Sequence, residues 1–331
     1  MPHKITIRNT DHVFTAEEKA SVLKAGLLEG LNLDHNCANG SCGECKARLV
    51  EGQLESLRHH DYRLSDQEKE DQVFLMCCHR AKSDLLIETH ESETAADIPH
   101  QEIKAKVGKL EVLQEGVMQF QLRTPRSKGL HFLAGQGVNL SFKGQPPFHL
   151  DIASCPCDSI QLRFHLRRRD ECDFSTYVFD KMKKNAEVMV SGPVGEFTLN
   201  EQSERPIIFI AWECGFAPIA SLIDHVIQKD EDREIHFYWL SAISQGHYLS
   251  NYCRAWVDAL DNFHYHSIDL APYGEESFDS VFETISKEHT ELVAWDIYMN
   301  CPEHQVEEMR AKVLALGVPD SQLKMSAVDY G

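Results

Sequence analysis

The chain has 331 residues, of which 42% are hydrophobic and 26% are charged, and this composition is typical of a folded protein with two or three domains. Its formal net charge of −19 disfavours nucleic acid and anionic membranes as partners. The charge suits docking to a basic surface on a partner protein, unless it serves only solubility. No apolar run reaches membrane-spanning length, and the first residues lack the apolar core of a signal peptide, so we expect a cytoplasmic protein without membrane insertion.

The first segment, residues 1–92, predicts a small mixed sheet around a cysteine-rich loop. Strand patterns at 3–9 and 12–16 precede apolar residues at helical spacing over 17–30. The other elements expected in this segment are strands at 45–52 and 84–90 and a helix that begins after Ser65 as its cap. Residues 93–101 are polar and contain a proline, so we expect a linker there.

The second segment, residues 102–200, consists mainly of short strand patterns separated by turn residues. This arrangement predicts an antiparallel β-barrel, interrupted by one helix at 175–184. The strands are expected at 103–113, 117–124, 137–142, 149–154, 160–167, 186–192 and 196–199. The basic run at 166–170 is expected to be a solvated loop, although it could meet an anionic ligand or an acidic neighbour.

The third segment, residues 203–331, alternates strand and helix patterns, which predicts a parallel, doubly wound sheet. Strands are expected at 206–212, 234–242, 263–270, 294–300 and 323–328, and helices at 217–228, 247–260, 278–288 and 304–317. His264 and His266 would share one face of a strand. We expect a surface role for them, because the sequence shows no carboxylate partner at a metal-ligand spacing.

The cysteines point to a metal centre. There are 11 of them in a chain without an export signal, which disfavours a disulfide scaffold. Cys37, Cys42 and Cys45 follow the C-x4-C-x2-C spacing of plant-type [2Fe–2S] clusters, whereas zinc sites favour paired short spacings. The glycines between them let the loop turn sharply and aim its amides inward. The fourth ligand is Cys77 or Cys78, since only one of two adjacent thiols can face the cluster.

Three further stretches carry a family resemblance that extends over nearly the whole chain. VSGPVGEF (190–197), IIFIAWECGFAPI (207–219) and DIYMNCPE (296–303) match segments at corresponding positions of one group of reductases. The chain resembles the iron-sulfur flavoprotein reductases that feed bacterial oxygenases, which are ferredoxin-fused members of the ferredoxin-NADP reductase superfamily.

The resemblance implies a multidomain fold of α+β and α/β type. It implies a β-grasp [2Fe–2S] ferredoxin domain at 1–92, a linker at 93–101, an FAD-binding-type antiparallel barrel at 102–200 and an NAD(P)-binding-type domain with a doubly wound parallel sheet at 203–331. In this family the fourth ligand stands six residues before the serine of a Ser-Asp pair. Ser83-Asp84 therefore selects Cys77, and Cys78 becomes a buried neighbour.

The nucleotide motifs of the family are replaced. At the flavin motif R-x-Y-S the chain has Phe148, Leu150 and Asp151, and a later G-x-x-S segment retains only Ser175. These four residues are the candidate FAD contacts. The nicotinamide turn G-G-T-G is replaced by 212–215, where a tryptophan fills space and a glutamate repels phosphate. The sequence therefore leaves FAD binding open and disfavours ordinary NAD(P)H use.

At the family's G-x-R segment, residues 240–242 of this chain contain no arginine. At the family's C-G-P segment, the cysteine is displaced by one position, to Cys301. Tyr330 lies where some relatives place a terminal aromatic residue over the flavin.

Three functions follow from these observations. The favoured one is an electron-transfer component that passes single electrons through a [2Fe–2S] cluster to or from a protein partner, such as an oxygenase or another metalloenzyme. The second is an active NAD(P)H-dependent FAD/[2Fe–2S] reductase. The third is a sensor or assembly protein that uses its cluster for regulation.

Overall fold

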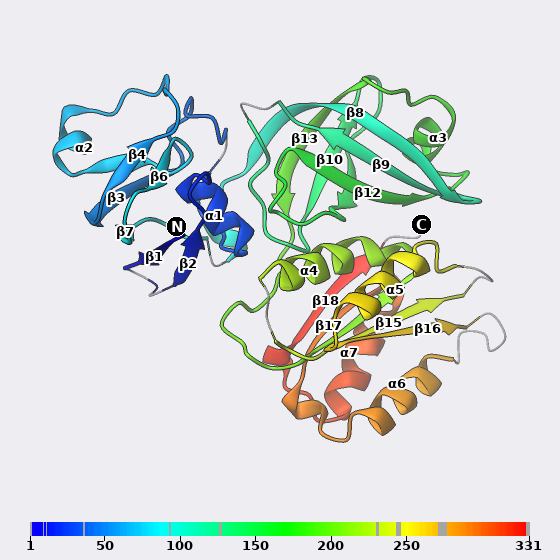
Figure 1. Cartoon of the computed structure of the whole chain (residues 1–331). Helices are drawn as coiled ribbons and strands as arrows, with labels where there is room; N and C mark the ends of the chain where they lie inside the picture. Colours follow the sequence, from blue (N-terminus) through cyan, green and yellow to red (C-terminus); the bar gives the residue numbers. More distant parts are fainter. Residues whose placement is uncertain are drawn as a thin grey trace.

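The computed structural model describes residues 2–8, 10, 12–35, 37–92, 94–125, 128–229, 232–242, 246–270 and 277–328, with only the backbone of 277–280. Its strands form three main sheets that follow one another along the chain (Figure 1). Tyr330, compared above with the terminal aromatic residue of some relatives, lies outside the described residues. None of the helices within the described ranges is long and apolar enough to cross a membrane.

The amino-terminal domain is a five-stranded sheet of order β2-β1-β7-β3-β5 with one helix packed against it. Its central strands β1 and β7 are parallel, while β2 and β3 run antiparallel to their neighbours. This topology confirms the expected β-grasp fold. The elements are β1 (His3–Ile7), β2 (Val13–Ala16), α1 (Val22–Leu28), β3 (Lys46–Glu51), β4 (Leu54–Ser56), α2 (Asp66–Glu70), β5 (Val73–Leu75), β6 (His79–Ala81) and β7 (Leu85–Glu88).

Local capping fixes both helices of this domain. Ser21 accepts a hydrogen bond from the Lys24 amide at 3.2 Å, so α1 begins later than the apolar pattern alone indicates. Ser65 and Glu68 form a reciprocal capping box at the start of α2, which confirms Ser65 as the expected cap. The described residues between α1 and β3 form no helix, and Leu33 among them makes an isolated bridge with Glu91.

The middle domain is a six-stranded antiparallel sheet of order β11-β10-β13-β8-β9-β12. The sheet curls until its ends approach, and the Ala153 amide donates to the Arg163 carbonyl at 2.8 Å. Buried alternate side chains fill the barrel interior. Its elements are β8 (Gln101–Gln114), β9 (Val117–Arg123), β10 (Gly137–Phe142), β11 (Phe148–Asp151), β12 (Gln161–Arg167), α3 (Asp173–Asp180) and β13 (Glu187–Val194). A short 3-10 turn (Ala95–Asp97) lies in the segment before β8.

The carboxy-terminal domain is a five-stranded parallel sheet of order β16-β15-β14-β17-β18, as the alternating pattern predicts. Figure 1 shows α4 and α5 on one face of this sheet and α6 and α7 on the other. The strands are apolar on both faces because both are covered. The elements are β14 (Ile207–Trp212), α4 (Phe216–Gln228), β15 (Ile235–Ser241), α5 (Ser250–Ala259), β16 (Phe263–Asp269), α6 (Ser277–Glu288), β17 (Asp296–Pro302), α7 (Val306–Ala315) and β18 (Leu323–Val328).

Polar contacts join the three domains. The Ser221 hydroxyl on α4 donates to the Ser154 carbonyl of the barrel at 2.8 Å. The Gln228 side-chain amide donates to the carbonyl of Leu28, at the end of α1, at 2.8 Å. Helix α4 therefore touches both the barrel and the amino-terminal domain.

Candidate functional site

The four predicted cluster ligands lie together in the amino-terminal domain. Cys37 and Cys42 have their sulfur atoms 3.2 Å apart. The neighbouring Cys77 thiol lowers the pKa of the Cys45 thiol, while the charge of Cys37 raises it. Three thiols come from the loop before β3 and the fourth from the turn between β5 and β6. The fold thus brings the four cysteines of the sequence motif together in one part of the domain.

Backbone amides of the same loop point at these sulfurs. The Cys37 sulfur accepts from the amides of Asn39, Ser41 and Cys42 at 3.3–3.4 Å, and the Cys42 sulfur accepts from the Glu44 amide at 3.4 Å. Burial raises the pKa of the Cys37 thiol, but hydrogen bonds from the Ser41 side chain, from the Asn39 and Cys42 amides and from the Cys42 thiol outweigh burial and lower its pKa to about 6. The loop therefore favours the thiolate at Cys37, which is the form that binds iron.

Two glycines make this loop geometry possible. Gly40 and Gly43 have φ values of +89° and +82°, in the left-handed region that favours glycine. A Cβ atom on Gly43 would lie 2.3 Å from the Tyr62 ring, and one on Gly40 would lie 2.5 Å from the Cys78 sulfur. Cys78 is fully buried against this loop, with its sulfur 3.5 Å from that of Cys77. The thiols, inward amides and tight glycines fit a [2Fe–2S] cluster.

A cavity of about 380 Å³ lies between the barrel and the carboxy-terminal domain. Three of the four predicted flavin residues line it, namely Phe148, Leu150 and Asp151. The Phe148 ring stacks on Phe174 with centroids 4.4 Å apart and planes 7° apart. Asp151 lies 3.3 Å from the His149 ring nitrogen, and this contact raises the pKa of His149. These three side chains offer no cation for the phosphates of a flavin.

Ser175, the fourth predicted flavin residue, is engaged within the protein. Its hydroxyl is fully buried, accepts from the Arg169 amide at 2.8 Å and donates to the Arg167 carbonyl at 3.3 Å. It does not belong to the cavity lining. Arg169 does line the cavity, with its guanidinium 5.8 Å from the centre of the Phe148 ring. The basic run at 166–170 is therefore not simply a solvated loop, which corrects that expectation.

The turn that replaces the nicotinamide motif is occupied by an ion pair. Glu213 adopts φ +45°, so the backbone keeps a left-handed conformation that glycine would adopt without strain. Its carboxylate is 8% exposed and pairs with Arg167 on barrel strand β12, while its carbonyl accepts from the Trp239 indole at 3.0 Å. Glu213, expected to repel phosphate, is thus paired with a positive charge, and this ion pair joins the barrel to the carboxy-terminal domain at the turn.

The neighbouring Asn300 shows how tightly this turn is closed. A Cβ atom on Gly215 would lie 1.9 Å from the Asn300 side-chain oxygen. Asn300 is fully buried, and within the described part of the chain neither polar atom of its amide has a hydrogen-bond partner. Asn300 stands at the carboxyl end of β17, beside the turn. Asn300 therefore packs closely against the backbone of this turn at Gly215.

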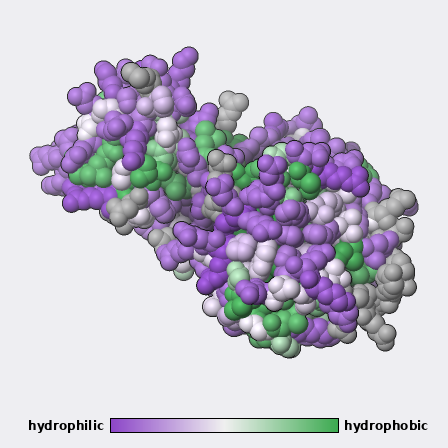
Figure 2. Space-filling model, turned by 60° about the horizontal axis from the view of Figure 1, so that its bottom comes forward, coloured by the Kyte–Doolittle hydropathy of each residue, from purple (hydrophilic) through white to green (hydrophobic). Residues whose placement is uncertain are grey.

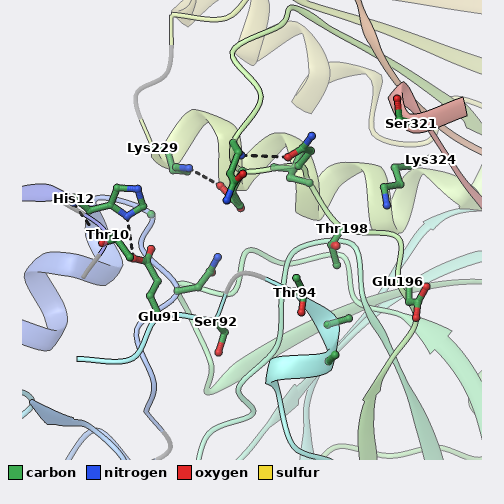
Figure 3. Close-up of a pocket in the computed structure, with 18 residues that line it drawn as sticks. Thr10, His12, Glu91, Ser92, Thr94, Glu196, Thr198, Lys229, Ser321 and Lys324 are labelled. Carbon is green, nitrogen blue, oxygen red and sulfur yellow. Dashed lines mark hydrogen bonds and ion pairs between the residues drawn. The ribbon is translucent and has the colours of Figure 1, made fainter. Parts of the chain in front are cut away.

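A wider cavity of about 790 Å³ lies where the three domains meet, and Figure 3 shows its polar lining. The His12 ring contacts Glu91 at 2.9 Å on one side, and the Lys229 ammonium contacts Glu201 at 2.5 Å on the other (Figure 3). None of the eight predicted site residues belongs to this lining. This cavity is a feature of domain docking and is separate from the thiol group and the flavin cavity.

Sequence reasoning missed one cluster of histidine and carboxylate side chains. His264 and His266 do share one face of β16, but they meet His236 on β15 and two carboxylates, Glu234 and Glu288. The expectation that these histidines lack carboxylate partners is therefore wrong. The partners come from other segments, and only the pairing of β15 with β16 brings them together. A signal existed in the period-two histidines of one strand facing a histidine in the next.

The fold and the four thiols define the class: a [2Fe–2S] ferredoxin domain joined to a ferredoxin-reductase module. Residues 5–82 match the model of the 2Fe-2S iron-sulfur cluster binding domain. The chain is 31% identical over 302 residues to Protein RfbI of Salmonella typhimurium, covering 90% of this chain and 88% of RfbI. It belongs to the family of ferredoxin-fused reductases of the ferredoxin-NADP reductase superfamily.

Two further comparisons agree. Over 254 residues the chain is 29% identical to the CDP-6-deoxy-L-threo-D-glycero-4-hexulose-3-dehydrase reductase of Yersinia pestis, covering 76% of this chain and 75% of that protein. The crystal structure of Amycolatopsis cytochrome P450 reductase GcoB superposes with a TM-score of 0.61 at 18% identity, covering 98% of each chain, and shows the shared fold. The chain is thus an electron-transfer component that works through a [2Fe–2S] cluster with a protein partner.

Proposed function

We propose that Cys37, Cys42, Cys45 and Cys77 hold the [2Fe–2S] cluster and that the downstream module does not use NAD(P)H in the manner of the family. The convergence of the four thiols, with the Cys37 and Cys42 sulfurs 3.2 Å apart, supports these residues as the ones that would hold the cluster. When bound, such a cluster accepts and donates one electron at a time. The observation that carries the proposal is the contrast between four converging thiols and a nucleotide turn closed by an ion pair.

The chain's own residues have defined roles in this proposal. The amides of residues 39, 41, 42 and 44 donate to the sulfurs and disperse their negative charge. The buried Met76 and Leu75 exclude water from the fourth ligand. Gly40 and Gly43 keep the loop close enough to Cys78 and Tyr62 to hold the thiols in place. Together these contacts position the ligands before the cluster binds.

The partner is a redox protein with a basic docking surface in this proposal. The net charge of −19 supports it, because opposite charges steer two proteins together. Hydrophilic residues cover most of the face in Figure 2, which suits a polar and transient contact. The name of the Yersinia pestis relative indicates a dehydrase as one kind of partner, besides an oxygenase. The predicted cytoplasmic location belongs to this proposal.

Cofactor analysis of protein purified without air tests both parts of the proposal, the bound cluster and the lack of NAD(P)H use. We expect about two irons and two sulfides per chain, a brown iron-sulfur spectrum, no releasable flavin and no bleaching by NADH or NADPH. Cys42→Ser and Cys77→Ser should each lose the cluster, whereas Cys78→Ser should keep it. Cys157→Ser, which removes an exposed thiol elsewhere, is the matched control. Cluster loss in Cys78→Ser with retention in Cys77→Ser would reverse the ligand assignment.

A second candidate is the active FAD-dependent reductase, which the cavity of about 380 Å³ favours. There Phe148 and Leu150 would offer apolar contact to a flavin ring, Asp151 would accept a hydrogen bond, and the segment around Ser175 would lie near the phosphates. Arg169 would supply the cation that the family motif places elsewhere. Stoichiometric FAD after heat release, with bleaching by NADH, would establish this candidate and exclude the first.

A further inference from the structure

A group of histidines lies at the amino-terminal edge of the parallel sheet, at the opposite end from the closed nucleotide turn. His236, the second residue of β15, pairs in register with His264 on β16, while Tyr238 pairs with His266. Alternate residues of a strand face the same side, so all four rings stand on the face covered by α6. The turn at Glu213 follows the carboxyl end of β14, roughly 15–20 Å away along the strands.

The rings of this group touch one another. The His236 ring lies 4.4 Å from that of His264, 5.5 Å from that of His266 and 4.4 Å from that of His289. His289 meets His236 edge-on, at 88°, and Trp295 meets it in the same way at 5.4 Å. Imidazoles this close cannot all carry a positive charge, so the arrangement favours neutral rings, which is the form that binds metal ions.

We propose that Glu234, His236 and His264 form a binding site for one divalent transition-metal ion, for which Zn²⁺ is the simplest probe. Their ligand atoms all lie within 4.8 Å of one another. The Glu234 carboxylate is 3.0 Å from His236 Nε2 and 3.8 Å from His264 Nε2. Ligand atoms of a tetrahedral zinc ion are about 3.3 Å apart, since zinc-to-ligand bonds measure about 2.0–2.1 Å.

The surroundings of His236 supply the support that a metal-binding histidine needs. Its other nitrogen, Nδ1, lies 3.3 Å from His266 Nε2 and can donate a hydrogen bond there once Nε2 is occupied. His266 Nδ1 in turn faces the Glu288 carboxylate at 4.0 Å, and Tyr238 fixes that carboxylate with a hydrogen bond of 2.5 Å. The His236 side chain is 14% exposed, whereas those of His264 and Glu234 are 45% and 51% exposed, so an ion can enter from solvent.

A second triad, His236, His266 and Glu288, also satisfies the distance requirement. We assign the ion to the first triad because Glu234 already contacts both of its histidines. In the second triad, Glu288 is engaged by the Tyr238 hydroxyl and lies farther from its histidine. The two assignments share only His236, so their other histidine can be tested. His264 is a ligand only in the first, and His266 is a ligand only in the second.

Calorimetric titration of the cluster-loaded full chain with Zn²⁺ tests the site, after EDTA treatment and desalting without air. We expect one zinc ion per chain, with iron content unchanged by the titration. His236→Gln and His264→Gln should each weaken binding by more than about 100-fold, and His266→Gln, which removes a supporting contact, by about 10-fold. His90→Gln is the matched control, because His90 also pairs with a carboxylate, at 2.9 Å from Asp34, and should stay within twofold.

Two results would overturn the proposal. One is the absence of saturable binding, or binding that neither His236→Gln nor His264→Gln changes. The other is loss of binding in His266→Gln while His264→Gln binds normally, which would assign the ion to the second triad. His264 is exposed, so its substitution should leave the fold intact, and the near-ultraviolet circular dichroism of the variants checks this. The outcome does not depend on the cluster or flavin assignments.

Discussion

The ion pair between Arg167 and Glu213 makes an asymmetric stability prediction. Arg167→Ala leaves the Glu213 carboxylate, 8% exposed, without a partner. Breaking a buried pair in this way costs about 3–5 kcal/mol, and we expect about 3 kcal/mol because Arg167 itself is 21% exposed. Glu213→Gly leaves the longer arginine, which can extend its guanidinium into water. It also relieves the left-handed backbone strain of about 1 kcal/mol, so its net cost should be about 1 kcal/mol.

Urea denaturation followed by tryptophan fluorescence measures this difference in the relevant domain. The four tryptophans, 212, 239, 256 and 295, all lie in the segment 203–331. With a slope of about 2 kcal/mol per molar urea, a loss of 3 kcal/mol lowers the midpoint by about 1.5 M, and a loss of 1 kcal/mol by about 0.5 M. The exposed neighbouring pair Arg168–Asp180 provides the control, since Arg168→Ala should leave the urea midpoint nearly unchanged.

The double variant Arg167→Ala/Glu213→Gly completes the test. It leaves no unpaired buried charge, so its midpoint should lie near that of Glu213→Gly and above that of Arg167→Ala. Equal losses for the two single variants, or a double variant as unstable as the sum of both, would refute the reasoning. We also expect that Glu213→Gly alone does not create NADH oxidation, because Trp212 remains in the turn and the buried Asn300 remains beside it.

Three further predictions follow from single contacts. Gly43→Ala should lower iron content severalfold, because the added Cβ meets Tyr62 at 2.3 Å, whereas Gly144→Ala, with φ +81° but open space, should lose only about 1 kcal/mol and keep its iron. Burial lowers the pKa of His165 to about 3, so this ring takes up a proton on unfolding and stability falls by about 1.4 kcal/mol per pH unit as pH drops from 6.5. His165→Gln should flatten that slope in urea titrations between pH 6.5 and 4, and an unchanged slope would contradict it. Burial raises the pKa of Glu201, but its histidine and lysine partners outweigh burial and lower it to about 2, so this stabilisation is present above pH 4.5 and lost toward pH 2. Glu201→Gln should therefore lose about 3 kcal/mol at pH 6 and little at pH 2, as measured by the same titrations.

Much of the fold could be predicted because the periodicity of apolar residues is a local property. Alternation of strands and helices from 206 onward predicted the parallel sheet, and regular short strands predicted the barrel. Helix boundaries were less predictable, since Ser21 caps α1 within a longer apolar pattern. Domain contacts such as that of Gln228 with the end of α1 join residues 200 positions apart and leave no local signal.

The sequence by itself determined the order of the three domains and the gathering of the cluster thiols, because three of the four lie within one nine-residue loop whose glycines permit a single tight turn. Only the tertiary structure decided which contacts the residues at the replaced nucleotide motifs make. Sequence shows Glu213 as an unfavourable charge, while the fold places Arg167 from a different domain against it. The tertiary structure also decided which side chains form the histidine group. Its members are separated by tens of residues, and which side chains of parallel strands become neighbours depends on strand register and helix packing, which distant parts of the chain set together.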